Sequence, residues 1–92
     1  MWSGHVAPNL KAHLTYFALQ LGAKRALDFA TFFAPRSPAL AALKYTQAEL
    51  FGKSHTLAVR EDWTSLADTL RALANIEEEF RTSLLKYQVE VG

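Results

Sequence analysis

Few residues of this 92-residue chain have the types and spacing that chemistry at a site requires. The histidines His5, His13 and His55 have no second histidine or acid four residues further on, which is the spacing of a helical metal site. Ser54, His55 and Asp62 supply the residue types of a catalytic triad, but adjacent side chains diverge on a helix. The sequence therefore predicts no metal site and no triad.

The acidic run Glu77, Glu78 and Glu79 does not form a carboxylate pair, because consecutive helical residues point about 100° apart. Its best interpretation is a solvated face. The chain has no cysteine, which excludes disulfides and thiol catalysis, and it has no glycine-rich phosphate loop. We expect no catalytic residue, no cofactor and no metal, and hence a non-enzymatic protein. The alternative is a subunit that contributes to an active site shared with another chain.

The elements of the chain are expected to be helices, because alanine and leucine dominate while valine and isoleucine are scarce. This composition predicts the all-α class, within a single domain over residues 1–92. The predicted helices cover residues 10–34, 38–56 and 63–89.

The predicted helix ends rest on local signals. Asn9, Ser37 and Asp62 each precede an apolar stretch and are expected to cap its first turn. Pro35 ends the first helix, because the residue before a proline is disfavoured in the α region. The second break, near residues 59–62, has no proline or glycine, so one kinked helix also fits the sequence there.

The first predicted helix carries a ridge of small residues, which lets another helix approach closely. This close-packing ridge recurs at every fourth position and contains Ala18, Gly22, Ala26 and Ala30. It fits either a membrane-type dimer seam or tight packing inside a soluble bundle. The mid-helix pair Lys24 and Arg25 favours the second interpretation.

The third predicted helix carries apolar residues at alternating steps of four and three, the period of a coiled coil. This interaction seam contains Trp63, Leu66, Leu70, Leu73, Phe80, Leu84 and Tyr87. Glu77 interrupts the seam, and either sets its register or is drawn to the surface by Arg81 four residues on, which we favour. A helix over residues 63–91 would be about 43 Å long. The sequence thus predicts an elongated three-helix bundle or a helical coiled-coil module that self-associates.

The two parts of the chain differ in charge. Residues 1–60 carry seven basic and two acidic side chains, whereas residues 61–92 carry three basic and seven acidic ones. We expect the two parts to pack against each other, within one chain or across a dimer. In the alternative, Lys24, Arg25, Lys44 and Lys53 contact an anionic membrane surface. Nucleic acid is not an expected partner, because the basic residues are dispersed.

The segment over residues 51–78 resembles an early part of the BAR domain of sorting nexins. The matching residues are Phe51, Lys53, Ser54, Glu61, Asp62, Thr64, Leu66, Leu70, Leu73, Ala74, Ile76, Glu77 and Glu78. The resemblance implies a dimeric coiled-coil module that senses or shapes curved membranes, in a truncated or divergent form.

Three functions remain open at this point. The first is a protein-protein interaction or scaffold module, intracellular and either soluble or membrane-peripheral, that docks through its third helix. The second is an accessory structural subunit of a larger complex, such as an organellar membrane complex. An acid-free first stretch of 27 residues, which is also typical of a transit peptide, agrees with this second function. The third is a subunit of an enzyme with a shared site.

Overall fold

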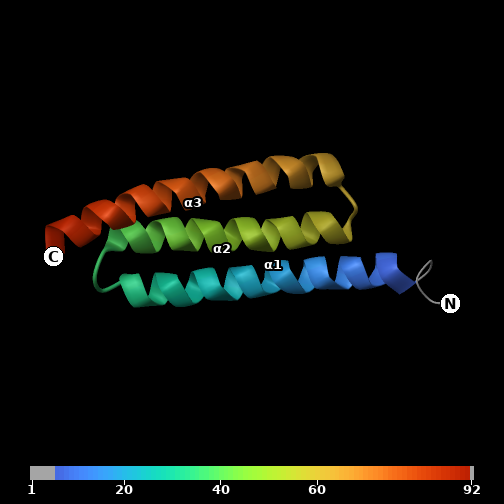
Figure 1. The fold of residues 1–92 in the computed structure, drawn as a ribbon, viewed down its shortest axis with the longest axis horizontal. Helices are drawn as coiled ribbons and strands as arrows, with labels where there is room; N and C mark the ends of the chain where they lie inside the picture. The colour runs from blue at the N-terminus through green and yellow to red at the C-terminus, as the bar shows by residue number, and fades with distance from the viewer. Residues whose placement is uncertain (1–5, 92) are drawn as a thin grey trace.

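The computed structural model describes the backbone of residues 6–91 and the side chains of residues 16–91. In this range the chain is all-α, as predicted, and contains no strand. The helices are α1 (Val6–Phe33), α2 (Pro38–Val59) and α3 (Trp63–Val91). Consecutive helices run antiparallel to each other, and α2 lies between α1 and α3 (Figure 1).

The predicted start of the first helix is wrong by four residues. The helix begins at Val6, so Asn9 lies within its first turns and not at the cap position. Pro8 is compatible with this earlier start, because the backbone N–H groups of a first turn have no partner within the helix. The end of α1 at Phe33, two residues before Pro35, agrees with the prediction.

The predicted caps of the other two helices are confirmed. The Ser37 hydroxyl accepts a hydrogen bond from the backbone N–H of Leu40 at 3.3 Å, and Pro38 follows as the first residue of α2. The Asp62 carboxylate accepts from the N–H of Ser65 at 3.2 Å in the first turn of α3. Both side chains satisfy backbone donors that would otherwise lack a partner.

Helices α2 and α3 are separate, so the alternative of one kinked helix is wrong. Glu61 has a φ of 58°, in the left-handed region. The N–H of Asp62 then donates to the carbonyl of Leu57 at 3.0 Å, and the N–H of Glu61 to that of Ala58 at 3.1 Å. These two bonds form a Schellman motif, which ends α2 and reverses the chain although no glycine is present.

Two apolar clusters lie at opposite ends of the helices. One contains Phe33, Leu40, Ala41 and Phe80, and the other contains Leu19, Ala58 and Leu66. The chain extends over 57 × 24 × 17 Å with a radius of gyration of 16.0 Å. A compact globule of this length would have a radius of gyration of about 12 Å. The predicted elongation is therefore present.

The ridge of small residues is used inside the chain. Ala26 and Ala30 are buried, and Gly22 faces the Phe51 ring of α2, whereas Ala18 is exposed. A Cβ atom at Gly22 would lie only 2.7 Å from that ring. The middle of the ridge thus allows the close approach of α1 to α2.

The seam on α3 is only half buried. Leu66, Leu73 and Phe80, at steps of seven residues, are buried, and Tyr87 and Leu84 are partly buried. Trp63 and Leu70 are 59% and 44% exposed. The seam would be fully buried only if helices packed on both sides of it. In the described part of the chain α3 makes backbone contact with α2 alone.

The two helical glycines are expected to respond oppositely to alanine. Gly22→Ala should lower the free energy of unfolding by up to about 2 kcal/mol, because the overpacking against Phe51 costs about 1–3 kcal/mol and the improved helix propensity offsets about 1 kcal/mol of this cost. Gly52→Ala should raise it by up to about 1 kcal/mol, since helix propensity improves and no atom lies within 4 Å of the new Cβ. Urea unfolding of both variants measures the difference. An equal response would contradict the close approach of α1 and α2.

The two halves of the seam should also differ in their contribution to stability. Leu73→Ala should lower the free energy of unfolding by about 2–5 kcal/mol, because the side chain is buried and leaves a cavity. Leu70→Ala should lower it by about 1 kcal/mol or less, because the side chain retains much contact with water in the folded state. Paired denaturant titrations test this, and a larger loss for Leu70 would show that the burial pattern of α3 is incorrect.

Candidate functional site

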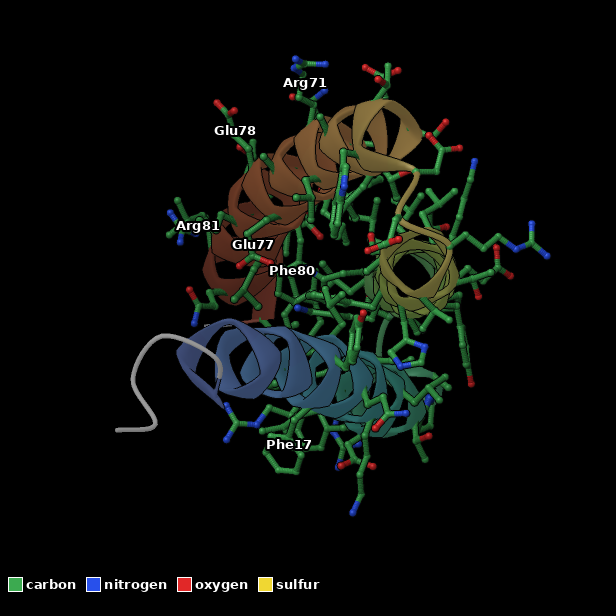
Figure 2. The ribbon with its side chains drawn as sticks, turned by 90° about the vertical axis from the view of Figure 1, so that its right-hand side faces the viewer. Phe17, Arg71, Glu77, Glu78, Phe80 and Arg81 are labelled. Atoms are coloured by element: carbon green, nitrogen blue, oxygen red, sulfur yellow. The ribbon has the colours of Figure 1, made fainter. Side chains whose placement is uncertain are left out.

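Polar side chains occupy the space between the two apolar clusters. The Lys44 Nζ atom donates to Gln47 Oε1 at 2.9 Å, and Gln47 Nε2 donates to Glu77 Oε2 at 2.7 Å. Lys44 Nζ lies 3.8 Å from the same Glu77 oxygen. Figure 2 shows Glu77 on the flank of α3 that is turned towards α1, while Arg71 and Glu78 point away. The cluster therefore joins residues 30 positions apart across α2 and α3.

Lys44 is the unusual member of this cluster, because only 7% of the residue is exposed. Its Nζ atom lies 4.1 Å from the ring centroid of Phe80 on α3 and 5.1 Å from that of Phe29 on α1. Burial lowers the pKa of Lys44, and the nearby Glu77 carboxylate offsets part of this effect. The ammonium group thus lies where all three helices meet.

Glu77 has two sets of partners. Its Oε1 atom lies 3.7 Å from Arg81 Nε, and its Oε2 atom accepts from Gln47. The interpretation that Arg81 draws Glu77 to the surface therefore describes one carboxylate oxygen only. The other oxygen provides the polar link that fixes the position of α3 along α2.

A lysine amine with a lowered pKa is a group type that can act as a nucleophile or a base. In this chain the Lys44 amine is held by Gln47 and lies against two aromatic rings. The two surface pockets described below are lined by other residues. The arrangement indicates that Lys44 has a structural role in holding the helices together.

Helix α1 carries exposed aromatic side chains. Phe17 is 64% exposed, and Phe29 and Phe32 are each 51% exposed. Figure 2 shows Phe17 pointing away from α2 and α3. Asp28, Phe29 and Phe32 line a shallow, mainly apolar pocket of about 280 Å³. Such a surface fits contact with another macromolecule better than chemistry on a small substrate.

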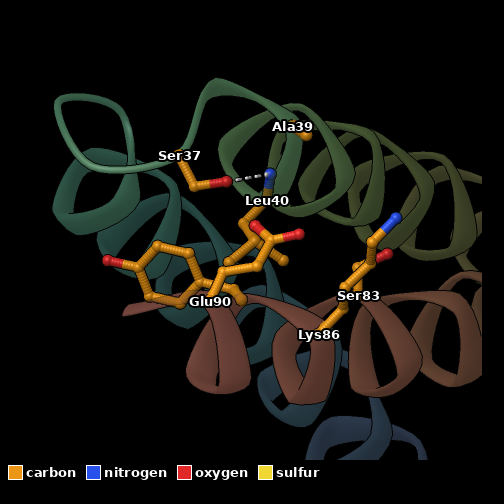
Figure 3. Close-up of a pocket in the computed structure, with 7 residues that line it drawn as sticks. Ser37, Ala39, Leu40, Ser83, Lys86 and Glu90 are labelled. Atoms are coloured by element: carbon orange, nitrogen blue, oxygen red, sulfur yellow. Dashed lines mark hydrogen bonds between the residues drawn. The ribbon is translucent and has the colours of Figure 1, made fainter. Parts of the chain in front are cut away.

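A second pocket of about 260 Å³ lies between the start of α2 and the end of α3 (Figure 3). Its charged walls are Lys86 and Glu90, which have opposite charge, and its Ser37 hydroxyl already accepts from Leu40. Its polar groups do not converge on one ligand chemistry. We therefore place the candidate functional site on the exposed apolar surfaces of the outer helices.

The predicted contacts to an anionic surface divide into two groups. Lys24, Arg25 and Lys53 are exposed, but Lys44 is buried, with its ammonium group beside the rings of Phe29 and Phe80. Among the ion pairs of the described residues, Lys44 with Glu77 joins the basic and acidic parts of the chain. The burial of Lys44 has a signal in the sequence. Lys44 lies four residues from each of the buried Leu40 and Ala48, so the three residues share one helix face.

The residues considered for chemistry are not brought together. The Ser54 hydroxyl is buried and donates to the carbonyl of Leu50 at 2.8 Å, and the His55 ring packs edge-on against Tyr16. The side chains of His5 and His13 lie outside the described residues. Within residues 16–91 no three potential ligands gather in a way that could hold a metal ion. None of the described helices has the length and apolar character needed to cross a membrane.

The buried amine predicts a specific dependence of stability on pH. Because the folded-state pKa of Lys44 is lowered, the unfolded chain binds more protons between that pKa and the ordinary value of 10.5. The contribution of Lys44 to stability should therefore rise with pH across this alkaline window. Urea unfolding gives the free energy of unfolding of the wild type and of Lys44→Met at each pH in this range. The difference between the two values isolates the contribution of Lys44. A difference that stays constant with pH would show that Lys44 is not buried in its charged form.

The comparison with known proteins assigns a family. Residues 1–85 match the family model described as the YobF C-terminal domain. The chain is 43% identical over 74 residues to the uncharacterized protein YobF of Bacillus subtilis (strain 168). That match covers 80% of this chain but 24% of the relative, so the chain spans about a quarter of the relative's length. No solved structure matches the chain. Since the family model covers nearly the whole sequence, this protein belongs to the YobF C-terminal domain family.

Proposed function

We propose that this chain is a non-enzymatic helical interaction module that self-associates as an elongated bundle. The observation that carries the proposal is the exposure of large apolar side chains on both outer helices. They are Phe17, Leu27, Phe29 and Phe32 on α1, and Trp63, Leu70, Leu85, Val89 and Val91 on α3. Exposed apolar surface of this extent is typical of sites that bind another protein or a membrane.

The packing of α3 supports this function. The core takes Leu66, Leu73 and Phe80 from the seam and leaves Trp63 and Leu70 at its open edge. A seam with one occupied and one open side is suited to receive a further helix. The open edge of the seam on α3 is therefore a surface through which the predicted docking can take place.

The buried polar groups also support an interaction role over catalysis. Among the described residues, each buried side-chain nitrogen or oxygen has a hydrogen-bond partner within the protein. An active site commonly keeps polar groups directed at the position of a substrate. Here such groups stabilise helix packing instead. In the longer YobF relative, a module of this kind would provide an assembly surface near the C-terminus.

A membrane-peripheral role is the second candidate, and the exposed pair Lys24 and Arg25 beside Phe17 and Phe32 favours it. Basic side chains next to apolar ones are the pattern of helices that lie on anionic bilayers. This role would agree with the BAR-like resemblance of residues 51–78. It would also fit an accessory subunit of a membrane complex.

Sedimentation velocity of the full chain over a wide concentration range tests the first proposal. We expect a reversible increase in sedimentation coefficient with concentration, because the open apolar surfaces become buried between copies. Co-sedimentation with neutral and acidic vesicles, each at low and high salt, tests the second candidate. A monomer at every concentration that also binds no partner would contradict the interaction module. Salt-sensitive binding to acidic vesicles alone would favour the membrane-peripheral role.

A further inference from the structure

One strip of α1 is not used by the core. Leu21, Arg25, Asp28 and Phe32 follow steps of four, three and four residues and therefore share a helix face. Leu21 is partly exposed and the other three are exposed. The buried residues of α1, such as Ala26 and Ala30, lie on the opposite side. We call these four residues the α1 outer strip.

The α1 outer strip is complementary to an inverted copy of itself. Its order along the helix is apolar, basic, acidic, apolar. When two copies pack antiparallel about a two-fold axis, Leu21 meets Phe32 of the second copy, and Arg25 meets Asp28 of the second copy. The same contacts then occur twice, as a closed two-fold interface requires. Parallel pairing would instead place equal charges together.

The charged residues of the strip are available for this pairing. Neither Arg25 nor Asp28 forms an ion pair with another described residue. The ion pairs of the described residues are Lys44–Glu77, Arg71–Asp68 and Arg81–Glu77. Both side chains are exposed in the single chain. The pairing therefore breaks no ionic contact found in the described part of the protein.

The pairing would bring Arg25 of the second copy close to a shallow, mainly apolar pocket beside Asp28. Asp28, Phe29 and Phe32 line about 280 Å³ of mainly apolar space. A guanidinium group binds carboxylates through its N–H donors and packs favourably on aromatic faces. The Arg36 guanidinium already lies 4.0 Å from the centroid of the Phe32 ring, so an incoming guanidinium group would pair with the Asp28 carboxylate and not with this ring face.

We propose that the α1 outer strip forms a symmetric, antiparallel interface with a second copy of this chain, in which Arg25 of each copy pairs with Asp28 of the other. The inference rests on the proposed self-association and assigns it to a surface. Charge favours a second copy over an anionic membrane, because Arg25 and Asp28 cancel within the strip, whereas a second copy pairs both of them. The strip from Leu21 to Phe32 extends about 17 Å along α1. A contact of this length lies at the small end of stable interfaces, so the dimer should be weak and reversible.

Two charge reversals test the pairing. R25D places two carboxylates opposite each other at both contacts, and D28R places two guanidinium groups there. Each variant alone should raise the dimer dissociation constant at least about tenfold. An equimolar mixture of R25D and D28R should restore association, because every contact of the mixed dimer then joins a carboxylate to a guanidinium group. Sedimentation equilibrium measures each sample, with the two variants distinguished by a fluorescent label.

Two controls separate this interface from other effects. K53D makes the same change of charge as R25D at an exposed position of α2 and should leave the dimer unchanged. Circular dichroism confirms that each variant keeps its helix content. If the wild type dimerises and both reversals dimerise equally well, the α1 interface is wrong while self-association stands. If the mixture fails to associate, the Arg25–Asp28 pairing is wrong. If the wild type is monomeric throughout, self-association and the α1 interface both fail.

Discussion

The buried ammonium group of Lys44 constrains the whole arrangement of helices. Removing a charge from water is costly unless it is paired and hydrogen-bonded. Gln47 accepts its hydrogen bond, Glu77 provides a nearby carboxylate, and the rings of Phe29 and Phe80 lie beside it. Because these partners come from all three helices, a shift of α1 or α3 along its axis would remove part of the compensation for the buried charge.

This constraint matters because α1 and α3 make no backbone contact in the described part of the chain. Their association depends on side chains, namely Lys44 of α2, which lies beside rings of both helices, and Phe33 of α1, which packs edge-on against Phe80 and Tyr87 of α3. Two helices that both pack on a third leave their outer faces open to water. The exposed apolar residues, and the interaction function that we propose from them, follow from this layout.

The segment over residues 51–78 illustrates how one sequence pattern serves several structural tasks. It contains the end of α2, the left-handed turn at Glu61 and the first half of α3. Phe51 at its start packs against Gly22, and Glu77 near its end receives the hydrogen bond from Gln47. The same stretch thus sets both the spacing of α1 from α2 and the position of α3.

The sequence by itself determined the all-α class, the three helices and the caps at Ser37 and Asp62. These features depend on residues within about four positions of each other, so local signals were sufficient. The tertiary structure decided the left-handed turn at Glu61, the burial of Lys44 and the open half of the α3 seam. Each of these depends on where the neighbouring helices lie. The bond between Gln47 and Glu77 crosses 30 residues of sequence, and a seam position is buried only where another helix lies against it.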